Sequence, residues 1–178
     1  RCRMLMGAAF DYDFKAYPLD FGLRTIEAFC DSSPYAVFLV NTSRETKLWP
    51  EDKWVALAKD CHKAGLSIRL LWGSEAEHER VQRIACSAGD FCQVLPRMSI
   101  KDCAAVLQKA SFVVGVDTGL THLAAATQRP TVGLFLDYPI ELVGLTGGCV
   151  KSLGGVGANP AVSEVKSALT QLGLDLFQ

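Results

Sequence analysis

A carboxylate, a hydroxyl and an imidazole lie close together at the end of one apolar segment. The run FVVGV (112–116) leads directly into DTGLTH, which carries Asp117, Thr118 and His122. The first turn of a helix has unpaired backbone N–H groups and a partial positive charge, so it binds anions readily. Gly119 would allow a ligand close to the backbone, and Thr118 adds a hydroxyl donor. The pattern favours an anion site, although Asp117 as a plain helix cap and His122 as a satisfied, partly buried histidine would also explain it.

A second polar group follows an earlier apolar run. YAVFLV (35–40) is followed by NTSRETKLWP, in which Thr42, Ser43 and Lys47 stand close together and Arg44 adds positive charge. Hydroxyls and a lysine after a strand suit a diphosphate, although the glycines of a phosphate-binding P-loop are absent. The alternative is a charged surface loop in solvent.

Two weaker signals come from the segments WGSEAEHE and PRMSI. A carboxylate just past a strand, such as Glu77, can accept both hydroxyls of a ribose. Equally, Glu75, Glu77 and Glu79 could only stabilise the dipole of a helix in its first turn. Met98 or Arg97 could lie against a flat base, while a methionine near a helix start is more often part of the core.

Several other kinds of chemistry are excluded by the sequence. It contains no G-x-S-x-G, no H-E-x-x-H and no G-x-G-x-x-G after a strand, and its three histidines are scattered. These absences argue against a hydrolase, a zinc protease and a dinucleotide dehydrogenase. The net charge of −1 gives no basic field for nucleic acid, and no apolar run approaches the roughly 20 residues of a membrane helix.

The cysteines are predicted to be reduced core residues. There are seven of them, an odd number, and no two have C-x-x-C spacing. Their positions inside apolar segments therefore suggest small buried side chains in a reducing compartment rather than a disulfide framework.

Apolar runs typical of strands alternate with amphipathic segments typical of helices. Strands are expected at 35–40, 67–72, 92–95, 112–116 and 131–135, and helices at 51–65, 74–89, 99–110, 121–127 and 161–173. This order predicts an α/β fold with a Rossmann-like, doubly wound, mostly parallel sheet. Residues 1–33 are expected to form a lead-in helix and a connector, and 144–157 is a glycine-rich stretch.

The same architecture indicates where a ligand would bind. Ligands of doubly wound sheets lie beyond the carboxyl ends of the strands. The loops at that edge are 41–50, 73–79, 96–98, 117–122 and 136–148. The polar groups described above all lie in these loops.

Read in order, four segments resemble the ADP-heptose:lipopolysaccharide heptosyltransferases of glycosyltransferase family 9. They are TSRETKLWPEDKW, LLWGSEAEHERVQRIA, RMSIKDCAAVLQKASFVVGVDTGLTHLAAA and RPTVGLF, within residues 35–135. The resemblance implies a GT-B enzyme of two Rossmann-like domains with its active site between them. It implies that this chain is the C-terminal domain alone, with 1–34 as interdomain linker and lead-in helix and 35–178 as the nucleotide-sugar-binding domain. The N-terminal acceptor domain would then be absent from this chain.

The reaction implied is the inverting transfer of L-glycero-D-manno-heptose from ADP-heptose to the Kdo of the lipopolysaccharide inner core. The donor would be bound here and the Kdo-lipid A acceptor through the missing domain, so the isolated chain would be inactive. The resemblance also implies a cytoplasmic protein of Gram-negative bacteria, with peripheral contact with the inner membrane open to the full-length form. A type II heptosyltransferase, a sugar-nucleotide epimerase and a stand-alone nucleotide-binding module remain alternatives.

The resemblance assigns roles to particular residues. Thr42, Ser43 and Lys47 would contact the diphosphate and the adjacent sugar, and Thr118, Gly119 and His122 would also contact the diphosphate. Asp117 would contact the heptose hydroxyls. Glu77 would bind the adenosine ribose, and Met98 would lie beside the adenine. The general base would be an Asp of the other domain, so no catalytic residue is assigned in this chain. The resemblance also implies that neither a metal nor a cofactor is needed. Leu136 and Asp137 replace the Gly-Pro-Thr-Asp-Pro turn usual in the family, so contacts from 136–148 are not carried over.

Overall fold

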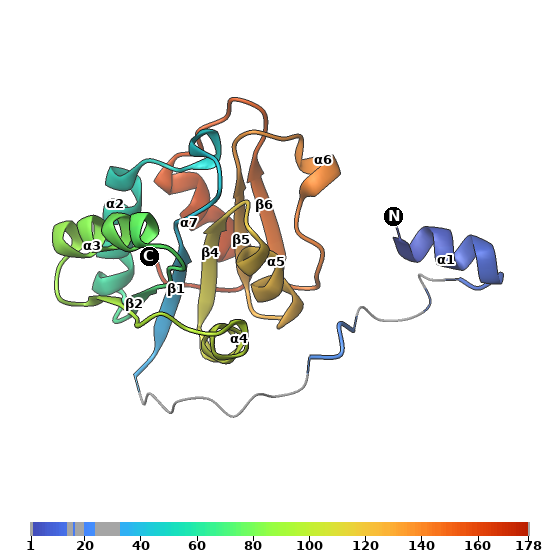
Figure 1. The fold of residues 1–178 in the computed structure, drawn as a ribbon, viewed down its shortest axis with the longest axis horizontal. Helices are drawn as coiled ribbons and strands as arrows, with labels where there is room; N and C mark the ends of the chain where they lie inside the picture. Colours follow the sequence, from blue (N-terminus) through green and yellow to red (C-terminus); the bar gives the residue numbers. More distant parts are fainter. Residues whose placement is uncertain (1, 14–15, 17–19, 24–32, 178) are drawn as a thin grey trace.

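A six-stranded sheet in which every pair of neighbours is parallel forms the centre of the protein (Figure 1). The computed structural model describes residues 2–13, 16, 20–23 and 33–177. The strands are β1 (Tyr35–Leu39), β2 (Ser67–Leu70), β3 (Cys92–Val94), β4 (Phe112–Val116), β5 (Thr131–Phe135) and β6 (Val150–Gly154), and they are ordered β3-β2-β1-β4-β5-β6. The doubly wound fold predicted from the sequence is confirmed.

Helices cover both faces of this sheet. On one face lie α2 (Glu51–Lys63), α3 (Glu75–Ala88) and α7 (Val162–Gln171), and on the other α4 (Ile100–Lys109) and α5 (Gly119–Ala126). Three further helices complete the described elements, namely α1 (Cys2–Phe10), the 3-10 helix η1 (Glu45–Lys47) and α6 (Ile140–Val143). Because both faces are covered, the strands can be apolar throughout.

Side chains of the central strands alternate between two apolar clusters, as the period of a strand requires. Phe38 packs with Trp54 of α2, their ring centroids 5.2 Å apart, in the cluster under α2, α3 and α7. Its neighbours Val37 and Leu39 belong to the cluster under α4 and α5. All five residues of β1 are buried, which explains the unbroken apolar run in the sequence.

The connections of the sheet diverge between β1 and β4. From β1 the chain proceeds outward to β2 and β3, and then returns to β4 on the other side of β1. In open α/β sheets the ligand crevice lies at such a switch point, beyond the carboxyl ends of the strands. The segments 41–48 and 117–119, which carry the predicted anion-binding residues, leave from these two strands.

Strand β6 is not among the strands predicted from the sequence. It lies in the glycine-rich stretch 144–157, where Val150–Gly154 pairs in parallel with β5. Its sequence VKSLG gives no continuous apolar run because the strand lies at the sheet edge and none of its residues is fully buried. The other strand predictions are confirmed, with β2 and β3 ending at Leu70 and Val94, slightly before the predicted ends.

Helix boundaries follow the predicted start and stop signals. Pro50 precedes α2, and Gly65 follows it with a positive φ of 83°. Ser99 caps α4, its Oγ accepting the backbone N–H of Asp102 at 3.2 Å. Trp54, together with the rest of the predicted apolar face of α2, is fully buried.

The expected lead-in helix is present as α1, which stands apart from the sheet in Figure 1. Its Leu5 and Phe10 side chains are exposed. Most of the predicted connector lies outside the residues that the structure describes. Among the helices described, none combines the length and apolar content needed to cross a membrane.

Gly115 allows α5 to pack closely on β4. The hydroxyl of Thr121, a fully buried residue, donates to the carbonyl oxygen of Val116 at 2.7 Å. A Cβ added at Gly115 would collide with that hydroxyl and would also lie 3.0 Å from the Cβ of Leu39. The glycine therefore sets the approach of the helix whose N-terminus faces the switch point.

We predict that Gly115→Ala lowers the free energy of unfolding by about 1–3 kcal/mol, the usual cost of overpacking. Urea denaturation followed by circular dichroism measures the change. Gly148→Ala is the matched control, because a Cβ there meets no atom within 4 Å. Equal stabilities of the two variants would contradict this packing.

The five cysteines whose side chains the structure describes divide into two groups, and the prediction for Cys2 and Cys30 lies outside these residues. Cys61, Cys92 and Cys103 are buried as predicted, but Cys86 and Cys149 are exposed, so the prediction of a core position is wrong for these two. Removal from water disfavours the thiolate and raises the pKa of Cys61 and of Cys92 to about 12 each. Burial also raises the pKa of Cys103.

We expect iodoacetamide at pH 8 to label Cys86 and Cys149 and to leave Cys61, Cys92 and Cys103 unmodified, since the thiolate is the reactive form. Peptide mass spectrometry reads out each site. Labelling in urea provides the control, because unfolding should make all five react. Native labelling of Cys61 as fast as that of Cys86 would be inconsistent with its burial.

Candidate functional site

An ion pair between Lys47 and Asp117 joins the ends of β1 and β4. Lys47 Nζ lies 2.6 Å from Asp117 Oδ2, and each side chain is only 15% exposed. The same two loops are tied by Thr42, whose Oγ1 donates to the backbone carbonyl of Asp117 at 2.9 Å. The structure therefore brings together residues 70 positions apart in the sequence, as the switch point requires.

The N-terminus of α5 opens toward the same edge of the sheet. Thr118 occupies the N-cap position with extended backbone, but its side chain makes no capping hydrogen bond. Asp117 does not cap the helix either, because its carboxylate turns to Lys47. A Cβ at Gly119 would meet nothing within 4 Å, so space lies directly over the first turn. Free first-turn amides beside such space suit an anion.

His122 lies at this opening. It is the fourth residue of α5, about one turn in as predicted, and its Nε2 is 3.8 Å from Asp117 Oδ1. The side chain is 45% exposed, so it is accessible at the opening, and its contact with a diphosphate stays a prediction. Its ring centroid lies 6.2 Å from that of Phe135.

A narrow pocket adjoins the helix N-terminus between β1, β2 and α4. Its volume is about 130 Å³, and it brings the predicted residues Glu77 and Met98 together with Thr118. Its apolar walls include Leu71 and Leu120. A mostly apolar hollow with a few polar groups at its rim is the usual form of a small-molecule site.

A second hollow of about 270 Å³ continues from this pocket. The two share Asn41 and Glu77, and the second also contains Thr42 and Arg80. Arg80 donates to Glu51 Oε1 at 3.0 Å and to the carbonyl of Trp49 at 2.8 Å. A polar path therefore runs from the narrow pocket to the loop that carries Lys47.

Glu77 has a structural task besides lining the pocket. Its Oε2 accepts the backbone N–H groups of Gly73 at 2.7 Å and Ser74 at 3.2 Å, while Ser74 Oγ accepts the N–H of Glu77 at 3.4 Å. This is a complete capping box, worth about 1 kcal/mol to the helix. The helix-stabilising alternative is thus realised for Glu77, and a ribose contact stays a prediction.

The remaining predicted residues lie at the same edge but with fewer contacts. Ser43 is exposed in the loop between β1 and η1, and Arg97 is exposed after β3. Met98 is partly buried against the cluster under α4 and α5, so it serves the core as well as the pocket wall.

The sequence interpretation missed Asn41 and Tyr138. Asn41 Nδ2 donates to the carbonyl oxygens of Leu71 at 3.4 Å and Glu77 at 3.5 Å, which links β1 to the pocket. Its position directly after a buried strand was the available signal. The tyrosine hydroxyl accepts from Arg44 Nη1 at 2.8 Å, a contact that no local pattern indicates.

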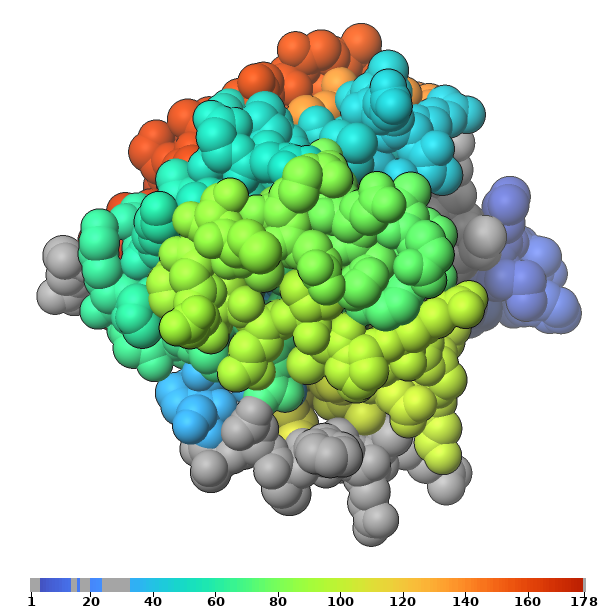
Figure 2. All heavy atoms as spheres, turned by 60° about the vertical axis from the view of Figure 1, so that its left-hand side comes forward, coloured from blue at the N-terminus to red at the C-terminus, as the bar shows by residue number. Residues whose placement is uncertain are grey.

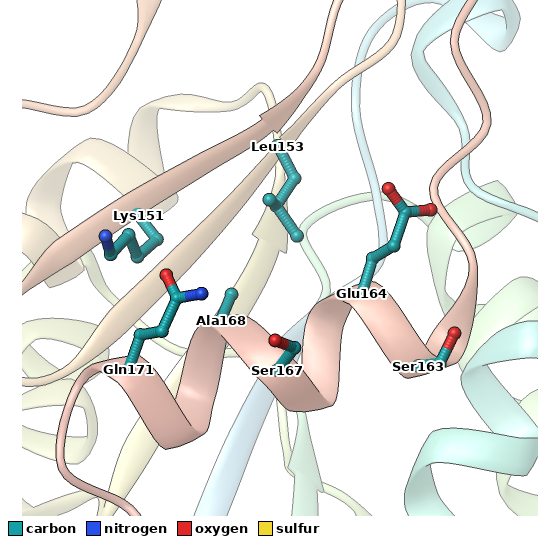
Figure 3. A pocket seen from close by; sticks show the side chains of 7 residues that line it. All are labelled: Lys151, Leu153, Ser163, Glu164, Ser167, Ala168 and Gln171. Carbon is teal, nitrogen blue, oxygen red and sulfur yellow. The ribbon is translucent and has the colours of Figure 1, made fainter.

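Two further observations limit the chemistry that the described residues can perform. The described residues hold no group of three or more His, Cys, Asp or Glu side chains able to bind a metal ion. A hollow of about 330 Å³ lies between β6 and α7, with Lys151 and Glu164 at opposite ends (Figure 3). Glu164 already accepts the N–H of Ala161 at 2.6 Å, so this hollow shows no converging reactive groups.

A doubly wound sheet with an open helix N-terminus and an apolar pocket at its switch point is the arrangement typical of nucleotide-binding α/β domains. The family model for glycosyltransferase family 9 (heptosyltransferase) matches residues 1–164, and the chain belongs to this family. It is 42% identical over 147 residues to lipopolysaccharide heptosyltransferase 1 of Salmonella typhimurium, covering 81% of this chain and 46% of that protein. The chain therefore spans about half the length of the relative it matches.

Solved structures give the same result. The E. coli heptosyltransferase WaaC with ADP superposes with a TM-score of 0.81 at 32% identity, over 96% of this chain and 55% of that one. The same enzyme with ADP-2-deoxy-2-fluoro heptose gives a TM-score of 0.78 at 31% identity, over 95% and 54% of the two chains. The predicted Rossmann-like α/β fold of the GT-B glycosyltransferases is confirmed.

We predict that Lys47→Met destabilises the protein by about 1–2 kcal/mol, because it leaves a mostly buried carboxylate without its partner. The double variant Lys47→Met/Asp117→Asn should recover part of this loss. Urea unfolding of both single variants and the double variant measures the coupling. Strictly additive changes in unfolding free energy would show that the two side chains do not interact.

Proposed function

We propose that this chain supplies the donor-binding half of an inverting heptosyltransferase, which transfers L-glycero-D-manno-heptose from ADP-heptose to the Kdo of the lipopolysaccharide inner core. The observation that carries the proposal is the convergence of Lys47 with the open N-terminus of α5 at the switch point, beside the pocket of Glu77 and Met98. The 32% identical solved relative bears ADP, which supports the same ligand class here.

In the proposed reaction, the carbon–oxygen bond between heptose and the β-phosphate breaks and negative charge builds on the departing ADP. The Lys47 ammonium, the first-turn N–H of Gly119 and the Thr118 hydroxyl stand where they stabilise that charge. They are held in place before the ligand arrives, so little reorganisation is needed. Thr42, Ser43 and His122 complete the diphosphate end.

Asp117 takes a positioning role in this proposal. Its carboxylate already accepts from Lys47 and lies 3.8 Å from His122, at the border between the diphosphate end and the sugar. It orients heptose hydroxyls and fixes the lysine. The acceptor hydroxyl loses its proton to an aspartate of the acceptor-binding lobe.

The nucleoside occupies the narrow pocket. Met98 packs beside the adenine, and Glu77 accepts from the ribose hydroxyls with the oxygen that its capping box leaves free. One carboxylate then holds both the helix start and the ligand.

The proposal divides the protein as the family resemblance implies. Residues 35–178 form the nucleotide-sugar-binding domain, and 1–34 the linker and helix toward an acceptor-binding lobe that presents Kdo-lipid A. The length of the matched relative, of which this chain covers 46%, supports a second lobe. Catalysis in the cytoplasm, at the inner face of the inner membrane, is part of the proposal.

An epimerase of the same architecture would need reactive carboxylates in this lobe. Asp117 is paired with Lys47, and Glu77 caps α3. These engagements favour donor binding, and the 42% identity to a type I enzyme favours type I over type II.

We predict that the 178-residue chain binds ADP roughly tenfold more tightly than UDP or GDP, a preference of about 1.4 kcal/mol. Isothermal titration calorimetry with the three nucleotides measures it. Gly119→Ala supplies the internal test: the new methyl group enters open space, so stability should hold while ADP binding weakens. Tighter binding of UDP than of ADP would contradict the proposal that ADP-heptose is the donor.

A further inference from the structure

The segment after β5 lies directly on the loop that carries Lys47. Thr46 Oγ1 donates to Asp137 Oδ2 at 3.0 Å, and Arg44 Nη1 donates to the Tyr138 hydroxyl at 2.8 Å. Arg44 also lies 3.8 Å from the Asp137 carboxylate. These contacts join residues more than 90 positions apart. In the space-filling view, cyan atoms of the 40s meet orange atoms of the later segment (Figure 2).

The aromatic ring of Tyr138 also meets the site lysine. Lys47 Nζ lies 4.9 Å from the centroid of the ring, while the same nitrogen lies 2.6 Å from Asp117 Oδ2. The ammonium is therefore held both by a carboxylate and by an aromatic ring. A lysine carries its charge on a flexible four-carbon stem, so contacts of this kind decide where the charge rests.

Tyr138 acts on two cations at once. Its ring contacts Lys47, and its hydroxyl fixes Arg44, whose side chain is 58% exposed. An exposed arginine loses considerable rotamer freedom when it binds a ligand, and a partner that orders it beforehand reduces that loss. Lys47 is paired with Asp117, the residue just before the N-cap of α5, so its ammonium lies beside the N-terminus of that helix.

We propose that Tyr138 is a positioning residue for the terminal phosphate of a nucleoside diphosphate. It holds Lys47 with its ring and Arg44 with its hydroxyl, so that both charges face the β-phosphate. The role rests on the proposed function of the site as a nucleotide-sugar-binding site. The segment at 136–139 thus serves the donor through protein cations rather than by touching phosphate itself.

Two substitutions separate the ring from the hydroxyl. Tyr138→Phe keeps the aromatic face, whose centroid lies 4.9 Å from Lys47 Nζ and 5.9 Å from Arg44 Cζ, and removes only the hydrogen bond with Arg44. Tyr138→Leu keeps apolar bulk and removes both the ring and the hydrogen bond. Leu142→Ala is the matched control, since Leu142 is 57% exposed and lies in α6 just after this segment. Urea unfolding of each variant reports any general loss of structure.

The experiment compares ADP with AMP on the 178-residue chain by calorimetry. For Tyr138→Leu we expect the dissociation constant of ADP to rise about fivefold and that of AMP to stay unchanged, because AMP lacks the terminal phosphate. Tyr138→Phe should fall between Tyr138→Leu and the unaltered chain. Leu142→Ala should match the unaltered chain for both ligands.

The outcomes distinguish this role from the function it rests on. If the unaltered chain binds no ADP, the proposed function fails and this role falls with it. If it binds ADP but Tyr138→Leu weakens ADP and AMP equally, or neither, only the positioning role is overturned. If Tyr138→Phe binds ADP no better than Tyr138→Leu does, the aromatic ring makes no contribution, and that part of the proposal is also overturned.

Discussion

The ion pair between Lys47 and Asp117 is the interaction on which the site depends. It spans the place where the connections of the sheet diverge and ties the loop after β1 to the loop after β4. Taking two charges largely out of water is costly, and a short pair with added hydrogen bonds offsets that cost. The result is a cation fixed at the carboxyl edge of the sheet before any ligand binds, which is the form of preorganisation that a departing phosphate needs.

The rest of the fold keeps a helix N-terminus beside that cation. Gly115 lets α5 approach β4, and the Thr121 hydroxyl bonds to the last carbonyl of that strand. The helix then begins without a side-chain cap at Thr118, which leaves its first-turn amides available. Ser74 and Ser99 cap α3 and α4 with their side chains, whereas the start of α5 has no such cap and coincides with the position where a ligand is proposed.

At the pocket proposed for the nucleoside, the same residues stabilise the fold and line the pocket. Glu77 closes the capping box of α3 and lines the pocket, and Met98 packs on the core while it forms the pocket wall. Because one side chain can stabilise a helix and line a pocket at the same time, a structural role for a residue does not exclude a role in ligand binding. At the other end, Arg44 and Tyr138 bring a third loop to the site from the segment after β5.

The sequence by itself determined the alternation of strands and helices, because strands buried on both faces must be apolar throughout and helix ends carry local signals such as Pro50 and Gly65. It also indicated the anion corner at Asp117, and the S-x-x-E pattern at Ser74 was a readable sign of the capping box. Strand β6 was not predicted from the sequence, because an edge strand is only partly buried and its sequence therefore shows little apolar pattern. Only the tertiary structure decided that Asp117 pairs with Lys47 and that Tyr138 meets Arg44. Those contacts join residues 70 and 94 positions apart, and strand order rather than local sequence brings them together.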